Sequence, residues 1–130
     1  MSKARGRVLV MDDEEPIRRV AERVLSGLGC EVEVAADGAA AVACYRAARE
    51  GGHPFDLVVL DLTVPGGMGG VEALAQIHQL DPRVQVVVSS GYSDAAALAD
   101  HLAHGFVAVM PKPWTAEELR QVVVDLVPKR

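Results

Sequence analysis

Aromatic side chains are scarce in this 130-residue chain, where Phe, Trp and Tyr together make up 4% of the residues. This scarcity excludes a core built on large rings. Half of the residues are nevertheless hydrophobic, so a core of Val, Leu and Ala can form without disulfides or a structural metal. Because the length is that of one ordinary domain, we expect residues 1–130 to form a single domain.

Long hydrophobic runs and blocks of like charge are also missing. No stretch approaches the roughly 18 apolar residues of a membrane span, and the polar, basic N-terminus does not resemble a signal peptide. The net charge is −5 and both signs are scattered, which argues against direct binding to nucleic acid or to a membrane surface. The two cysteines, Cys30 and Cys44, lack metal-ligand spacing. We expect free thiols in a cytoplasmic protein, or in a soluble part of a larger one.

Short apolar runs alternate along the chain with longer segments of helical periodicity. The predicted strands are Val8–Met11, Glu31–Ala35, Leu57–Leu60, Val84–Val88 and Val107–Met110. The predicted helices are Glu15–Leu28, Gly38–Glu50, Gly70–Leu80, Asp94–His104 and Thr115–Val127. Most strands are apolar on both faces, which is typical of a parallel sheet covered by helices on each side. The sequence therefore predicts an α/β fold, a doubly wound (βα)5 sandwich with a five-stranded parallel sheet.

Three details of these elements are specific enough to check. The alternating strand Glu31–Ala35 is expected near an edge of the sheet. Thr115 and Glu118 are spaced to form a capping box at the last helix. The first helix is expected to bury one face, formed by Ile17, Val20, Val24 and Leu28.

Polar residues follow the predicted strands at the points where they end. Asp12 and Asp13 follow the first strand, with Glu14 next, and Asp61 follows the third. The fourth strand leads into Ser89-Ser90-Gly91, and the fifth into Pro111-Lys112-Pro113. Because ligands of open parallel sheets bind at the carboxyl ends of the strands, we expect these side chains to converge.

Three clustered carboxylates repel one another unless a cation joins them. All-oxygen ligation suits Mg²⁺ or Mn²⁺, and Lys112 adds a positive charge for an anion. The pattern indicates metal-assisted phosphoryl chemistry, with Asp61 placed to attack phosphorus and carry the group as an acyl phosphate. Each residue alone also has a simpler interpretation. Asp12-Asp13 could cap the first helix, Asp61 and Ser90 could be turn residues, and Lys112 could be a solvated surface charge.

Taken together, these segments resemble the receiver domain of bacterial two-component response regulators. The matching motifs are VLVMDDE (8–14), LVVLDLTVPGGMGG (57–70), VVVSSGYSD (86–94) and VMPKPW (109–114). The segments DLTVPGGMGG and SSGYSD are most like receivers of hybrid sensor histidine kinases. The resemblance implies a flavodoxin-like fold and a partner that donates phosphoryl groups, either a sensor histidine kinase or a histidine phosphotransfer domain.

The resemblance also implies a role for each site residue. Asp61 would be the phosphoacceptor, and Lys112 would pair first with Asp61 and then with a phosphoryl oxygen. Asp12, Asp13, Asp61 and the backbone carbonyl of Thr63 would bind Mg²⁺ (or Mn²⁺). Ser90, directly before Gly91, would be the switch hydroxyl, and Lys112-Pro113 is a candidate cis peptide bond. No turnover enzyme is implied, only autocatalytic phosphorylation and slow self-dephosphorylation.

One position departs from the receiver pattern: Val109 stands where an aromatic residue usually precedes the lysine by three positions. A valine has no large ring to rotate, which removes the usual aromatic relay from this chain. Tyr92 and Phe106 could replace it, although packing is the favoured role for both. Trp114 is expected to cover the lysine loop as an apolar lid.

Two further sets of residues allow more than one interpretation. The glycines at 66, 67, 69 and 70 could admit a partner's helix close to Asp61, or could form a loose turn. His101 and His104 have a spacing that could hold a metal on a helix, but we expect both to be surface residues. His53 and His78 carry no functional signal.

Two other functions compete with the phosphoacceptor interpretation. A haloacid-dehalogenase-like, Mg²⁺-dependent phosphatase also uses an aspartate nucleophile, but it needs a second acid where this chain has Thr63. A phosphorylation-independent pseudo-receiver would bind partners without chemistry, which the complete set of acceptor-site residues disfavours. We expect the output to pass by protein contact or through a parent chain.

Overall fold

The computed structural model describes residues 6–91 and 95–127, and the fold alternates strands and helices throughout. The strands are β1 (Arg7–Met11), β2 (Glu31–Ala35), β3 (Leu57–Asp61), β4 (Gln85–Ser90) and β5 (Ala108–Pro111). The helices are α1 (Glu15–Gly27), α2 (Gly38–Glu50), α3 (Gly70–Leu80), α4 (Ala95–His104) and α5 (Ala116–Leu126). Every predicted element is present, and the bounds of most differ by one or two residues.

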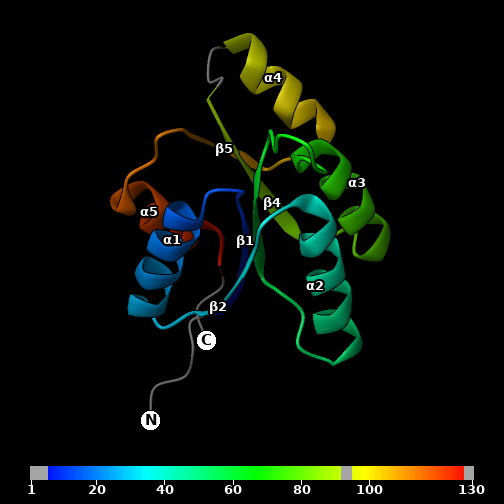
Figure 1. Cartoon of the computed structure of the whole chain (residues 1–130), viewed down its shortest axis with the longest axis vertical. Helices are drawn as coiled ribbons and strands as arrows, with labels where there is room; N and C mark the ends of the chain where they lie inside the picture. Colours follow the sequence, from blue (N-terminus) through cyan, green and yellow to red (C-terminus); the bar gives the residue numbers. More distant parts are fainter. Residues whose placement is uncertain (1–5, 92–94, 128–130) are drawn as a thin grey trace.

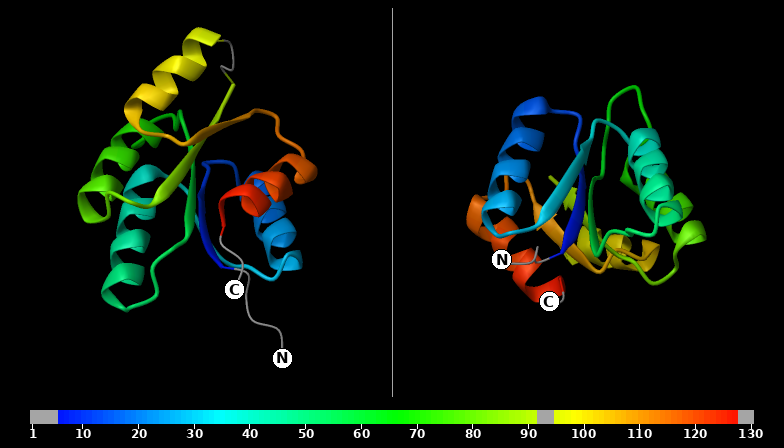
Figure 2. Two further views of the ribbon diagram at one scale, coloured as in Figure 1. Left: turned by 180° about the vertical axis from the view of Figure 1, so that it is seen from behind. Right: turned by 90° about the horizontal axis from the view of Figure 1, so that it is seen from below.

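All neighbouring strands of the sheet pair in parallel, in the order β2-β1-β3-β4-β5. Helices α1 and α5 cover one face, and α2, α3 and α4 lie on the other (Figure 1, and from below in Figure 2). The predicted doubly wound (βα)5 sandwich is therefore confirmed. The strand order reverses between β1 and β3, so the carboxyl ends of these two strands form the switch point where open α/β sheets bind ligands.

Burial follows the position of each strand in the sheet. Strand β3 lies between two neighbours and all five of its residues are buried. Strand β2 lies at an edge, as predicted, and only Ala35 of its five residues is buried. The difference explains why β3 is a continuous apolar run ending in one acid, whereas β2 alternates charged and apolar residues.

Two hydrophobic cores hold the sheet between its helices. The core under α2, α3 and α4 contains Leu9, Leu60, Tyr45, Ile77 and Phe106. The core under α1 and α5 contains Val10, Val59, Leu25, Met110 and Leu119. Because successive residues of a strand point to opposite faces, adjacent residues of β1 and β3 divide between the two cores.

The predicted buried face of α1 is wrong in part. Val20 is 46% exposed, and the fully buried residues of the helix are Ala21 and Leu25. Val24 and Leu28 are only partly buried against the core under α1 and α5. Relative to the predicted orientation, the helix is turned so that the small side chain of Ala21 faces the sheet. The prediction missed this because alanine contributes little to a hydrophobicity pattern.

Local signals at the ends of the helices are confirmed more directly. Thr115 Oγ1 accepts from the backbone N–H of Glu118, and the Glu118 side chain accepts from the backbone N–H of Thr115, which completes the capping box. The Lys112-Pro113 peptide bond is cis, as the resemblance implied. None of the helices within 6–91 and 95–127 is long and apolar enough to cross a lipid bilayer.

The prediction that both His101 and His104 are surface residues is wrong for His101. His104 is exposed and lies 3.8 Å from the Asp100 carboxylate, whereas His101 is 4% exposed and meets the Phe106 ring edge-on at 6.3 Å between centroids. The last turn of α4 packs its inner side against Phe106, and this tertiary contact has no signature in the helix itself. The two histidines thus face different environments, which argues against a shared metal site.

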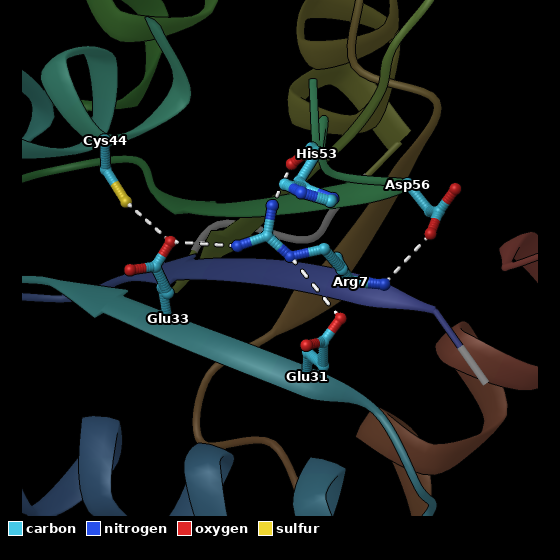
Figure 3. A network of polar contacts seen from close by, with 6 residues as sticks. All are labelled: Arg7, Glu31, Glu33, Cys44, His53 and Asp56. Carbon is cyan, nitrogen blue, oxygen red and sulfur yellow. Dashed lines mark hydrogen bonds and ion pairs between the residues drawn. The ribbon is translucent and has the colours of Figure 1, made fainter. Parts of the chain in front are cut away.

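Arg7 connects three segments at the amino end of the sheet (Figure 3). Its guanidinium pairs with Glu31 at 3.7 Å and Glu33 at 3.3 Å, and donates to the His53 carbonyl. The guanidinium carbon also lies 4.6 Å from the centroid of the Phe55 ring. The edge strand β2 is thereby joined to β1 and to the loop before β3, away from the acidic residues at the other end of the sheet.

The thiol of Cys44 donates to the same Glu33 carboxylate, at 3.4 Å (Figure 3). Burial, the hydrogen bond to Glu33 and the negative charge of Glu33 together raise the pKa of Cys44 to about 11. Since the thiolate is the reactive form, Cys44 is expected to alkylate slowly at pH 8.5, and Glu33→Gln is expected to speed the reaction roughly 3- to 10-fold.

Iodoacetamide labelling followed by peptide mass spectrometry measures this rate. Glu31→Gln is the matched control, because it also removes an ion pair of Arg7 but does not touch Cys44. Equal rates in the two variants would show that Glu33 does not set the reactivity of this thiol.

Candidate functional site

Asp61 lies at the carboxyl end of the buried central strand and is itself 3% exposed. The chain leaves the sheet at the next residue, where the backbone N–H of Leu62 donates to the carbonyl of Ser89 on β4. The strand pairs with β1 as far as Leu60 and with β4 through Asp61 itself, so the acid is fixed at the switch point of the sheet.

The other two predicted acids lie beside it. Ligand oxygens of Asp12, Asp13 and Asp61 all fall within 4.8 Å of one another. Asp12 is 2% exposed at the end of β1, whereas Asp13 faces solvent. The structure therefore confirms that the three carboxylates converge, and the carboxylate of Asp13 is accessible to solvent.

Lys112 reaches into this cluster from the loop after β5. Its Nζ lies 3.0 Å from Asp12 Oδ2 and 3.1 Å from Asp61 Oδ2, and 4.0 Å from a carboxylate oxygen of Glu14. Burial lowers the pKa of Lys112, but the hydrogen bonds and charges of Asp12 and Asp61 outweigh it and raise the pKa above its ordinary value. The ammonium group therefore stays charged and neutralises one of the buried carboxylates.

One lysine does not neutralise the whole cluster. Burial and the negative charge of Asp12 together raise the pKa of Asp61 to about 6, against the opposing effect of the Lys112 ammonium. At neutral pH, Asp61 is ionised and the pocket keeps an excess of negative charge on hard oxygen ligands. Such a donor set fits Mg²⁺, which prefers a few carboxylates and completes its shell with water and phosphate oxygens.

The simpler interpretation of Asp12 as a helix cap explains only one of its oxygens. Asp12 Oδ1 accepts from the backbone N–H of Glu14 at 2.9 Å, in a turn just before α1. The N-cap residue of α1 is Glu14, whose side chain makes no capping hydrogen bond. The second oxygen of Asp12 faces Lys112, so the side chain serves both the turn and the pocket.

The sequence of the chain matches the family described as "Response regulator receiver domain" over residues 8–124. The chain belongs to this family. Receiver domains are signalling domains that accept phosphoryl groups from histidine kinases or phosphotransfer proteins, and the acidic pocket is where the family binds Mg²⁺.

Relatives of the receiver include both small and large proteins. The chemotaxis protein CheY of Bacillus subtilis is 30% identical over 118 residues, covering 90% of this chain and 93% of CheY. Several other curated relatives, such as the transcription factor SKN7 of Chaetomium thermophilum and NtrC of Escherichia coli, are much longer, and the chain spans 15% and 23% of their length. The whole-protein activities of those relatives therefore do not follow for this chain.

Solved structures agree with the fold. The chemotaxis protein CheY4 of Vibrio cholerae superposes with a TM-score of 0.84 at 26% identity, covering 97% of this chain and 100% of CheY4. A Borrelia burgdorferi structure described as a CheX-CheY-BeF3-Mg+2 complex superposes with a TM-score of 0.82 at 27% identity, covering 94% of this chain and 90% of that one.

The two remaining residues of the predicted site, Ser90 and Thr63, differ in their exposure to solvent. Ser90 is 2% exposed at the end of β4, and its carbonyl accepts from the backbone N–H of Lys112 at 2.9 Å. Thr63 is exposed in the loop after β3. Ser90 thus ties the lysine loop to the sheet, while the role of the Thr63 carbonyl remains a prediction.

The glycines after Asp61 have a use that neither interpretation of the sequence included. A Cβ atom on Gly69 would lie 2.6 Å from the Leu62 carbonyl oxygen, and one on Gly70 would lie 2.8 Å from the Asp61 carbonyl oxygen. The first turn of α3 therefore packs directly on the backbone that carries Asp61. Gly66 has a φ of 75°, in the left-handed region that favours glycine.

Val109 and its neighbours pack as ordinary apolar residues. Val109 is half-buried against the core under α2, α3 and α4, and Phe106 is 2% exposed in the same core, which confirms its packing role. Tyr92 lies outside the described residues. Trp114 is partly buried on the other side of the sheet and lines a hollow of about 430 Å³ next to Lys112, together with Pro16, Ile17 and Val20 of α1.

One supporting contact of the pocket has no signal in the sequence. The guanidinium of Arg18, in the first turns of α1, donates to the backbone carbonyl of Asp12 at 2.8 Å. It holds the end of β1 against the helix that follows. Arginine is common on exposed helix faces, so nothing marks this one in advance.

The charge repulsion in the pocket leads to a prediction about the stability of the folded protein. In the absence of divalent ions at pH 7.5, Asp61→Asn is expected to raise the free energy of unfolding by about 1–2 kcal/mol, because one pKa unit corresponds to about 1.4 kcal/mol and Lys112 keeps Asp12 as a partner. The pKa of folded Asp61 lies above its unfolded value, so the wild type recovers stability as the pH falls from about 6 toward 4. The difference between the two proteins should shrink over that range.

Urea unfolding in EDTA at several pH values measures the effect. Asp125→Asn, an equal charge change on the exposed side of α5, should show no such gain. A less stable Asp61→Asn variant at pH 7.5 would contradict the account of the pocket.

Proposed function

We propose that residues 1–130 form a single cytoplasmic receiver domain that takes a phosphoryl group on Asp61. The donor is a phosphohistidine of a sensor histidine kinase or of a histidine phosphotransfer domain. The observation that carries the proposal is the position of Lys112 Nζ, 3.0 Å from Asp12 and 3.1 Å from Asp61. The ammonium group of Lys112 thereby contacts both the nucleophile Asp61 and the neighbouring acid Asp12 at the switch point of the sheet.

The transfer exchanges one bond to phosphorus for another. An oxygen of ionised Asp61 forms the new O–P bond as the N–P bond of the phosphohistidine breaks, and the departing imidazole takes a proton from solvent. Mg²⁺ (or Mn²⁺), held by Asp12, Asp13, Asp61 and the Thr63 carbonyl, would neutralise the charge on the phosphoryl oxygens. Lys112 moves from the Asp61 carboxylate to a phosphoryl oxygen, and water later removes the group slowly.

The switch that follows begins at Ser90. Its hydroxyl would hydrogen-bond the phosphoryl group, and its carbonyl already joins the lysine loop through the backbone of Lys112. Val109 offers no ring rotation to report this movement, so displacement of the lysine loop itself is the simplest signal to the surface. An apolar hollow beside Lys112, lined by Ile17, Val20 and Trp114, offers a protein donor a surface to dock on next to the pocket.

Acetyl phosphate tests the acceptor chemistry without a kinase. Incubation of the wild type with acetyl phosphate and Mg²⁺ should add the mass of one phosphoryl group, and EDTA should prevent the addition. Asp61→Asn should add none, and Asp13→Asn should add much less, because it lacks a carboxylate for the metal. Intact-mass spectrometry reads all four reactions.

Two results would defeat the proposal. The first is no mass gain in the wild type at saturating acetyl phosphate. The second is an equal gain in Asp61→Asn, which would place the phosphoryl group elsewhere. Steady turnover of a small phosphate ester would instead favour a phosphatase.

A further inference from the structure

A second serine precedes Ser90, and its environment is unusual. Ser89 is 2% exposed, and its Oγ has no hydrogen-bond partner within the described part of the chain. A buried hydroxyl left unpaired costs about 1–3 kcal/mol. The strand does not require a polar residue for its pairing, since Val86–Val88 before it are all apolar and buried. The hydroxyl therefore needs another explanation.

The register of the sheet shows where this side chain points. Ser89 shares a face of β4 with Val87, which belongs to the core under α1 and α5. Asp61 shares a face of β3 with Leu57 and Val59, which belong to the same core. Since Asp61 and Ser89 are paired in register, their side chains stand next to each other on one face, about 4.8 Å apart at the backbone.

Lys112 comes to the same face from the other side. Ser89 pairs in register with Met110 of β5, a residue of that same core, and Lys112 follows Met110 by two positions. Ser89 thus lies between the strand that carries Asp61 and the strand that leads to Lys112. Ser90 shares the opposite face with Val86 and Val88, in the core under α2, α3 and α4. The two serines therefore serve different sides of the sheet.

In the unphosphorylated protein the Asp61 carboxylate already has a donor, because Lys112 Nζ lies 3.1 Å from its Oδ2. Phosphorylation changes this balance. One carboxyl oxygen then carries phosphorus, and the lysine turns to the phosphoryl oxygens. The other carboxyl oxygen loses the lysine as a donor, and with one lone pair directed to the metal ion it keeps a second lone pair for a hydrogen bond. A hydroxyl on the same face, with its own hydrogen uncommitted, is placed to supply one.

We propose that the Ser89 hydroxyl donates to the carboxyl oxygen of phosphorylated Asp61 that does not carry phosphorus. The inference rests on the proposed phosphorylation of Asp61. When water attacks phosphorus, its oxygen forms a new O–P bond and loses a proton to solvent. The O–P bond to Asp61 breaks, its electron pair returns to the carboxylate, and inorganic phosphate leaves. A donor at that carboxylate stabilises the returning charge, so the hydroxyl shortens the lifetime of the phosphorylated protein.

Two matched pairs isolate the hydroxyl from changes in side-chain volume. Wild type and Ser89→Ala differ by the oxygen alone, and Ser89→Thr and Ser89→Val have the same branched shape with and without a hydroxyl. Each protein is phosphorylated with acetyl phosphate and Mg²⁺, freed of the reagent, and followed by intact mass. The member of each pair that lacks the hydroxyl should lose its phosphoryl group roughly 3- to 10-fold more slowly, as expected for one hydrogen bond of ordinary strength.

Urea unfolding of the same proteins, unphosphorylated, separates this role from a structural one. Because the hydroxyl is unpaired in that state, Ser89→Ala should be as stable as the wild type or more stable. Equal dephosphorylation rates within both pairs, or faster loss without the hydroxyl, would overturn the inference while leaving Asp61 as the acceptor. No phosphorylation of the wild type would instead remove the proposed function, and this inference with it.

Discussion

The balance of charge around Asp61 is the constraint on which the rest of the molecule depends. Asp12 and Asp61 are both almost fully buried, and Asp13 brings a third carboxylate within 4.8 Å of them. One ammonium group, Lys112 Nζ, offsets part of this charge. Burial and the remaining negative charge raise the pKa of Asp61. A divalent cation bound among these oxygens would reduce the repulsion between the carboxylates.

The fold fixes the positions of these four side chains, which belong to Asp12, Asp13, Asp61 and Lys112. They come from the ends of β1, β3 and β5, which are far apart in sequence and are brought together by parallel pairing through β4. The backbone around Asp61 has little freedom, because β1 and β4 flank it and Gly69 and Gly70 bring α3 into contact with its carbonyl groups. A conformational signal is then expected in the lysine loop, which is held by the Ser90 carbonyl, rather than in β3.

Most of the fold and the acids of the site could be predicted from the sequence, because both follow from local patterns. The predicted strands contain continuous apolar runs. Asp12 and Asp61 directly follow such runs, and Lys112 follows one after Pro111. What could not be predicted depends on contacts between elements. Ala21 replaces Val20 on the inner face of α1, and His101 is buried where it meets the ring of Phe106, a residue beyond the end of α4.

The two adjacent serines illustrate the same limit. The family pattern directs attention to Ser90, while the register of β3, β4 and β5 is needed to see that Ser89 shares a face with Asp61. The glycines at 69 and 70 likewise look like part of a flexible loop in the sequence, and only the positions of the Asp61 and Leu62 carbonyl groups reveal a close contact.

Magnesium binding, measured by isothermal titration calorimetry, tests the central claim most directly. The account predicts one Mg²⁺ per chain, with affinity reduced about tenfold or more by Asp13→Asn and unchanged by Asp125→Asn, whose side chain is exposed on α5. No saturable binding to the wild type, or equal affinity in Asp13→Asn, would contradict it.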